Sequence, residues 1–177
     1  MAKLSDIDKM AEEKGSALVT LWQFVKFIVV SLGAFVIQTF LPLLIKLPMS
    51  EAFKMQAFDW GLFKSTAEVG LGIFLAANIS NIIAQIVSFF INRDKTFNSD
   101  ANIAVTLPIY IVFTIALICF SAWLSPTLIT FFTGKIGENA AISVSGAVCG
   151  AIQFFLYFPV DKLLFSKKKE NKEETKA

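Results

Sequence analysis

Five polar side chains recur along one stretch of an otherwise apolar segment: Asn78, Asn81, Gln85, Ser88 and Asn92. Offsets of three and four residues separate them, so all five lie on one stripe of an α-helix. Side-chain amides donate and accept hydrogen bonds and need partners inside a membrane. Two interpretations stay open. The stripe either bonds to neighbouring helices, or it lines a hydrated path for a hydroxyl-rich or phosphate-bearing molecule.

Two basic residues, Arg93 and Lys95, directly follow the stripe. An arginine can pair with a phosphate through a bidentate fork and a lysine as a point charge, so both are candidate phosphate-binding residues. They could equally reflect the general excess of basic residues on the inner side of membrane proteins. Two amides in other apolar segments, Gln38 and Gln153, are candidates to face the same path.

The segments that carry these residues are long enough to cross a membrane. A helix that spans about 30 Å of hydrocarbon needs about 20 residues. The sequence predicts an all-α membrane protein with four spans: 27–47, 69–91, 103–124 and 140–159. The first is expected to be a retained span rather than a secretory signal, because a charged segment of about 25 residues precedes it and no small-x-small cleavage site follows.

The distribution of basic residues predicts the orientation of the chain. Of the 16 lysines and arginines, only Lys46, Lys54, Lys64 and Lys135 fall in the segments between the first and second or the third and fourth spans. The other twelve lie on the opposite side, which the positive-inside rule places in the cytoplasm. We therefore expect both termini inside a bacterial cytoplasmic membrane, with outer loops at 48–68 and 125–139.

Three regions follow from this pattern. Residues 1–23 form a cytoplasmic lead-in, where Leu4, Ile7 and Met10 at helical spacing predict a short amphipathic helix that breaks at Gly15. Residues 24–165 form the four-helix transmembrane domain. Residues 166–177 form a charged cytoplasmic tail. Between the first two spans, an aromatic segment at 50–64 is expected at the outer interface, as either helix or strand.

Several function classes have no support in the sequence. There is no histidine, and no DxD-like cluster or Gly-rich phosphate loop, so we expect no catalysis, no metal and no cofactor. The two cysteines, Cys119 and Cys149, fall inside spans, where packing as small apolar groups is expected. No acidic or basic residue is expected in mid-membrane, which argues against a proton-coupled carboxylate pump. No nucleic-acid partner is expected.

A faint repeat relates the two halves of the chain. Gln85 to Phe97 and Gln153 to Phe165 share the same separation, which predicts two like-oriented helical hairpins. Gly146 and Gly150 form a small-xxx-small surface suited to close helix contact. Four helices alone leave little room to shield a polar cargo, so we expect a homo-oligomer or a complex with another membrane protein.

The end of the second span resembles the signature of the GtrA-like family. Phe89, Asn92, Arg93, Thr96 and Phe97 match the pattern F-x-x-N-R-x-W-T-F that is typical of this family, with Lys95 where tryptophan is usual. Phe27 and Gly33 look like the family's opening pattern. The resemblance covers residues 24–165, and the fourth span departs from it by ending in FPVDKLLF rather than in a second Asn-Arg pair.

This resemblance implies a role with polyprenyl-phosphate sugars. Proteins of this family are thought to move polyprenyl-phosphate-linked monosaccharides from the inner to the outer leaflet, for glycosylation of envelope polysaccharide or teichoic acid. Arg93 and Lys95 would then hold the phosphate. The sugar path would include Asn78, Asn81, Gln85, Asn92, Gln153 and Gln38. The alternative is an accessory module that anchors a membrane glycosyltransferase and transports nothing.

Overall fold

The computed structural model describes residues 4–66 and 69–165, and four long helices dominate it. They are α2 (Ser16–Lys46), α4 (Leu71–Ile91), α5 (Ile103–Ile136) and α6 (Glu138–Phe165). Each is long and apolar enough to cross a membrane. The prediction of an all-α membrane protein with four spans is therefore confirmed.

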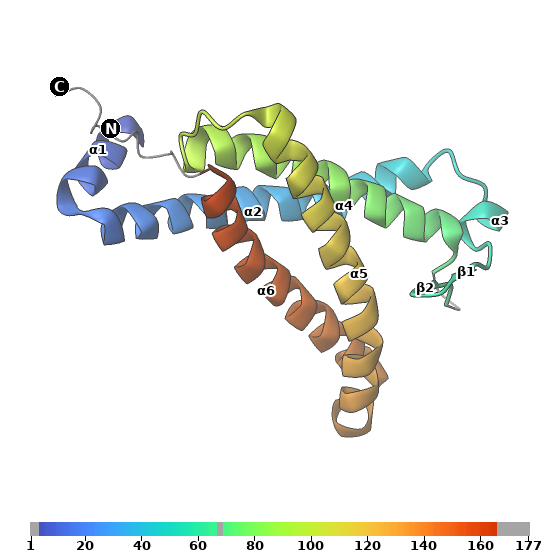
Figure 1. The fold of residues 1–177 in the computed structure, drawn as a ribbon. Coiled ribbons are helices and arrows are strands. Elements are labelled where there is room, and N and C mark those ends of the chain that lie inside the picture. Colours follow the sequence, from blue (N-terminus) through green and yellow to red (C-terminus); the bar gives the residue numbers. More distant parts are fainter. Residues whose placement is uncertain (1–3, 67–68, 166–177) are drawn as a thin grey trace.

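The four helices form two hairpins (Figure 1). Helix α2 packs mainly against α4, and α5 packs mainly against α6. The hairpins meet at one end, which we call the basal end, where α1 (Leu4–Lys14) and the last turn of α6 also lie. From there they diverge, so that the turns that close the two hairpins lie far apart. The two like-oriented hairpins that the repeat predicted are present.

The first hairpin begins earlier than the sequence suggested. Helix α2 is continuous from Ser16, so the predicted boundary at residue 23 falls inside it. The predicted amphipathic helix is α1, and Gly15 separates it from α2 with a positive φ of 110°. Asp8 fastens α1 to α2, because its Oδ1 accepts hydrogen bonds from Trp22 Nε1 at 2.6 Å and Lys26 Nζ at 2.9 Å.

The prediction of a loop at 125–139 is wrong, because this segment is helical. Helix α5 runs to Ile136 and α6 starts at Glu138, so only Gly137 separates them, with a φ of 81° that favours glycine. Helix α6 also continues through Pro159 to Phe165, beyond the predicted end of the fourth span. Membrane helices tolerate proline because neighbouring groups satisfy the freed carbonyls, so proline was a poor marker of the helix ends here.

The segment between α2 and α4 contains both kinds of secondary structure. A single helical turn, α3 (Glu51–Lys54), precedes a two-stranded hairpin of β1 (Asp59–Trp60) and β2 (Phe63–Lys64). Asp59 accepts a hydrogen bond from Gly61 N and pairs with Lys64, and both contacts lower the pKa of Asp59. Aromatic rings of this segment, Phe58, Trp60 and Phe63, contact Phe74 at the start of α4.

The core of the protein is an aromatic cluster at the basal end. It joins both hairpins through buried side chains: Phe27 of α2, Phe89 of α4, Tyr110 and Leu117 of α5, Tyr157 and Phe165 of α6, and Phe97. Ring contacts such as Phe89–Phe165, with centroids 5.1 Å apart, run across the two hairpins. Away from this cluster, α2 exposes many large apolar side chains, which in a membrane face lipid.

The motif at the end of α4 adopts a π-helical turn, η1 (Asn92–Thr96). Phe97 N donates to Asn92 O at 2.8 Å, five residues back, instead of the usual four. This wider turn buries Asn92, Thr96 and Phe97 together. The charged residues between them, Arg93, Asp94 and Lys95, remain at least partly exposed.

The glycine pair of α6 has no close helix contact within the chain. Gly146 and Gly150 are exposed, and nothing lies within 4 Å of the position that a Cβ would take at either residue. The expected close contact is therefore wrong for the helices of one chain, while a contact between chains stays a prediction. The thiols of Cys119 and Cys149 are both free, half-buried and buried respectively.

Candidate functional site

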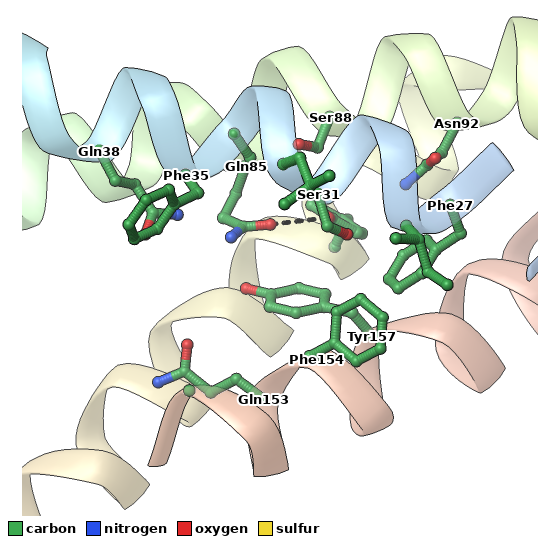
Figure 2. Close-up of a pocket in the computed structure, with 15 residues that line it drawn as sticks. Phe27, Ser31, Phe35, Gln38, Gln85, Ser88, Asn92, Gln153, Phe154 and Tyr157 are labelled. Atoms are coloured by element: carbon green, nitrogen blue, oxygen red, sulfur yellow. Dashed lines mark hydrogen bonds between the residues drawn. The ribbon is translucent and has the colours of Figure 1, made fainter. Parts of the chain in front are cut away.

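A cavity of about 330 Å³ lies between the two hairpins, and we call it the inter-hairpin cavity. All four long helices contribute to its lining (Figure 2). Its polar members are Ser31, Gln38, Gln85, Ser88, Asn92, Tyr110, Gln153 and Tyr157. Its apolar members include Phe27, Phe35 and Phe154. A half-open space with amides, hydroxyls and aromatic walls thus lies between the membrane-spanning helices.

Two glutamine side chains extend into this cavity from opposite hairpins (Figure 2). Gln85 of α4 accepts a hydrogen bond from Tyr110 Oη at 3.1 Å, and Gln153 of α6 donates to Ser121 Oγ at 2.6 Å. Each carboxamide offers two N–H donors and two acceptor lone pairs, and one bond uses only a fraction of that capacity. The two residues related by the sequence repeat can therefore both bind polar groups of a ligand.

The polar stripe of α4 divides between the cavity and other partners. Gln85, Ser88 and Asn92 line the cavity, whereas Asn78 and Asn81 do not. Asn78 Nδ2 donates to Phe74 O of its own helix at 2.9 Å. Asn81 Oδ1 accepts from Gln38 Nε2 at 3.2 Å, which joins α4 to α2. The interpretation as bonding between helices is confirmed for Asn81, whereas a path for a polar molecule stays a prediction for the residues that line the cavity.

The two predicted phosphate-binding residues lie at the basal end, outside the cavity lining. Arg93 Nε donates to Ala101 O at 3.0 Å, and its guanidinium pairs with Asp94 at 2.6 Å. Arg93 therefore helps to hold the connection between α4 and α5. Lys95 is exposed. Neither geometry excludes phosphate at the membrane surface, but the structure does not bring these side chains to the polar cavity.

Beside the cavity, Asn92 belongs to a buried polar cluster. Its Nδ2 donates to Asp161 Oδ2 at 2.7 Å, and its Oδ1 accepts from Thr96 Oγ1 at 2.9 Å. Asp161 is fully buried, and its Oδ1 has no hydrogen-bond partner among residues 4–66 and 69–165. The cluster thus connects a residue of the cavity lining to an enclosed carboxyl group.

Sequence reasoning missed Asp161. The fourth span was expected to end at Pro159, but α6 continues past it to Phe165 and carries Asp161. Asp161 lies four residues before the end of α6, so the expectation of no charged residue in mid-membrane is not contradicted, but a buried acidic residue near the helix end was not foreseen. The sequence did contain one signal for this residue, because the apolar run continues on both sides of Asp161. Ionisable residues inside apolar membrane helices are rare and often belong to functional sites.

Two tyrosines of the cavity lining were not among the predicted site residues. Tyr110 and Tyr157 are buried, and their rings contact each other with centroids 5.5 Å apart. Tyr157 Oη donates to Thr114 Oγ1 at 3.0 Å. With these bonds their hydroxyls are satisfied inside the protein, and the rings form one wall of the cavity.

Comparisons of the chain with family models, with curated proteins and with solved structures found no match. The geometry of the inter-hairpin cavity is therefore what supports a function for this protein.

Proposed function

We propose that this protein moves a polyprenyl-phosphate-linked monosaccharide from the inner to the outer leaflet of a bacterial cytoplasmic membrane. The observation that carries the proposal is the inter-hairpin cavity, where amide and hydroxyl groups gather within a largely apolar lining between helices whose outer surfaces are apolar. Such a transporter needs no catalytic group of its own. The proposal agrees with the resemblance of the Asn92-Arg93 motif to the GtrA-like family.

The lining of the cavity suits a sugar. Its amides and hydroxyls can exchange hydrogen bonds with sugar hydroxyls, while Phe27 and Phe154 offer apolar faces to the ring. A volume of about 330 Å³ is at the small end of the range for ligand pockets, about 300–1,000 Å³. The sugar path that we propose therefore includes Gln38, Gln85, Asn92 and Gln153, with Asn81 as the support of Gln38 and Asn78 outside the path.

The lipid chain would remain in the bilayer during this movement. One side of the cavity is made by α2, whose residues Leu32 and Phe35 both line it and are exposed on the surface. A sugar could enter between the helices while its polyprenyl chain stays among lipid tails. This lateral access distinguishes a lipid-linked cargo from a water-soluble sugar.

Before translocation, the phosphate would bind near the basal end, and it would then cross together with the sugar to which it is bonded. No lysine or arginine is among the residues that line the cavity, and a charged group moved into such a space would bear a large desolvation cost. Lys95 is exposed at the basal end, beside Arg93. The positive-inside rule supports the assignment of this end, and of both termini, to the cytoplasm. There Lys95 and Arg93 can meet a lipid phosphate.

A flipping assay tests this proposal. Purified protein in liposomes, with a labelled polyprenyl-phosphate sugar, should expose the label to the opposite side faster than empty liposomes do. Gln85→Leu and Gln153→Leu should slow the movement at least tenfold, because each removes a polar group from the cavity. Asn78→Leu is the matched control. Its amide bonds within α4 and should be dispensable for transport.

Equal rates for wild type and empty liposomes, with the protein folded, would instead favour the accessory module. In that case the protein would anchor a membrane glycosyltransferase, and its loss would lower synthesis of the lipid-linked sugar itself. The exposed Gly146 is the position that we propose for contact with this partner or with a second copy of the chain, because Gly150 lines the inter-hairpin cavity. Cross-linking in native membranes that recovers only monomer would contradict such a complex.

A further inference from the structure

Asp161 is a carboxyl group enclosed by protein near the end of α6. Its side chain is fully buried, Oδ2 accepts from Asn92, and Oδ1 has no hydrogen-bond partner in the described part of the chain. An ionised carboxylate in such surroundings has a large free-energy cost, and buried carboxyl groups hold a proton instead. The geometry therefore favours the neutral form whenever the site is closed.

Among residues 4–66 and 69–165, the groups that face Asp161 do not supply a positive charge. Tyr110 of α5 and Tyr157 of α6, which lie near it, carry hydroxyl groups rather than basic ones, and Asn92 and Thr96 of η1 do not titrate. Of the basic residues that the structure describes at this end, Lys26 pairs with Asp8, Arg93 pairs with Asp94 and Lys162 donates to Thr20. Lys95 is exposed.

The position of Asp161 is the joint between the hairpins. Hydrogen bonds that cross from one hairpin to the other include Asn92–Asp161, Tyr110–Gln85 and Lys162–Thr20. Beyond this joint the hairpins diverge (Figure 1). A change of charge on Asp161 would therefore act where a small movement changes the angle between the hairpins. Asn92 would transmit the change, because it also lines the inter-hairpin cavity.

We infer that Asp161 is a proton-binding site that couples a proton gradient to the movement of one hairpin against the other. In each cycle one proton binds to a carboxylate oxygen from water on one side of the membrane. The same proton leaves to water on the other side. The ionised form requires water or additional donors, so it opens the joint, and the neutral form closes it. This coupling rests on the transport function proposed above and supplies its energy source.

The movement can be tested without transport. Spin labels at Leu47→Cys, just beyond α2, and Ile136→Cys, the last residue of α5, report the distance between the two hairpin turns. Both positions are exposed, and the native cysteines are first replaced by Cys119→Ala and Cys149→Ala. In lipid nanodiscs the distance distribution should shift between acidic and alkaline pH.

Asp161→Asn should abolish this shift and keep the distribution of the acidic form at every pH. The control is Asp100→Asn, an exposed carboxyl in the connection before α5, which should behave as wild type does. A distribution of the wild type that does not change with pH, or a shift in Asp161→Asn equal to that of wild type, would overturn the inference.

Infrared spectroscopy of the wild type tests whether the Asp161 carboxyl group holds a proton. This measurement does not require that a variant fold correctly. At neutral pH, where exposed carboxyl groups are ionised, a C=O stretch of a protonated carboxylic acid, sensitive to exchange into D₂O, should be present and should lose its intensity on titration to alkaline pH. At neutral pH this band should be missing in Asp161→Asn and retained in Asp100→Asn. If the wild type shows no such band at neutral pH, Asp161 holds no proton there and the inference fails.

The liposome assay then separates the two claims. An imposed pH gradient should change the flipping rate of the wild type severalfold, and the rate of Asp161→Asn should be the same with and without the gradient. If the wild type moves the lipid but ignores the gradient, the inference is wrong while the proposed function stands. If the wild type moves no lipid but shows the pH-dependent distance and the infrared band, the proposed function is wrong while Asp161 remains the proton site of a hairpin movement.

Discussion

Asn92 and Asp161 are 69 residues apart in the chain, and the Nδ2 atom of Asn92 donates a hydrogen bond of 2.7 Å to Oδ2 of Asp161. Both side chains are buried, within an environment of aromatic rings. This bond joins the end of the first hairpin to the end of the second. It makes the basal end a polar joint set inside an apolar cluster.

Removal of Asn92 should therefore destabilise the protein. We expect Asn92→Leu to lower the free energy of unfolding by about 1–3 kcal/mol, because a buried carboxyl is left without its partner. The double variant Asn92→Leu with Asp161→Leu should lose less than the sum of the single variants. Reversible unfolding in mixed micelles measures these values. Asn78→Leu serves as control, with an expected loss below about 1 kcal/mol, and a loss equal to that of Asn92→Leu would contradict the prediction.

Arg93 and Lys95 should differ in their effects although both are basic. Arg93→Ala should lower the free energy of unfolding by about 1–2 kcal/mol, since its bond to Ala101 O is charge-assisted but reaches solvent. Lys95→Ala should change stability by less than about 0.5 kcal/mol, as expected for an exposed side chain. If Lys95 meets the lipid phosphate, its loss should nevertheless slow flipping. Unchanged flipping by Lys95→Ala would remove it from the phosphate site.

Cysteine labelling tests the orientation of the chain. In a variant without native cysteines, we expect an impermeant thiol reagent to label Leu62→Cys and Ile136→Cys from outside, and Asp100→Cys only after the membrane is opened. All three positions are exposed on the protein. Ser99 would be a poor probe, because it is buried and would resist labelling from either side. Labelling of Asp100→Cys in intact cells would show that the chain has the opposite orientation in the membrane.

The start of α4 should be sensitive to a single methyl group. A Cβ at Gly70 would collide with the backbone of Lys54 and Met55, and backbone cannot move aside as a flexible side chain can. Gly70→Ala should therefore lower the thermal stability of the protein or displace the outer segment. Gly134→Ala is the matched control, because nothing lies within 4 Å of its Cβ position and alanine favours a helix by about 0.5–1 kcal/mol. Equal melting temperatures for the two variants would contradict the prediction, because they would show that the outer segment shifts to accommodate the methyl group at little cost in free energy.

The sequence determined the class of the protein and the existence of its elements. Apolar runs of membrane length, with polar residues at helical spacing, are local signals that need no knowledge of packing. They predicted four helices, the amphipathic α1 and a turn at Gly15. Local signals were weaker at helix ends, where Pro159 and the run after Ser125 suggested termini that packing and the membrane do not require.

Only the tertiary structure decided which polar residues meet. The stripe of α4 places Asn78 and Gln85 on the same face, but the hairpins diverge, so Gln85 reaches the inter-hairpin cavity while Asn78 bonds to its own helix. The partner of Asn92 lay 69 residues away, on a helix expected to end earlier. Spacing along one helix fixes the face of a residue, whereas the angle between helices fixes its neighbours, and that angle depends on long-range packing of the aromatic cluster.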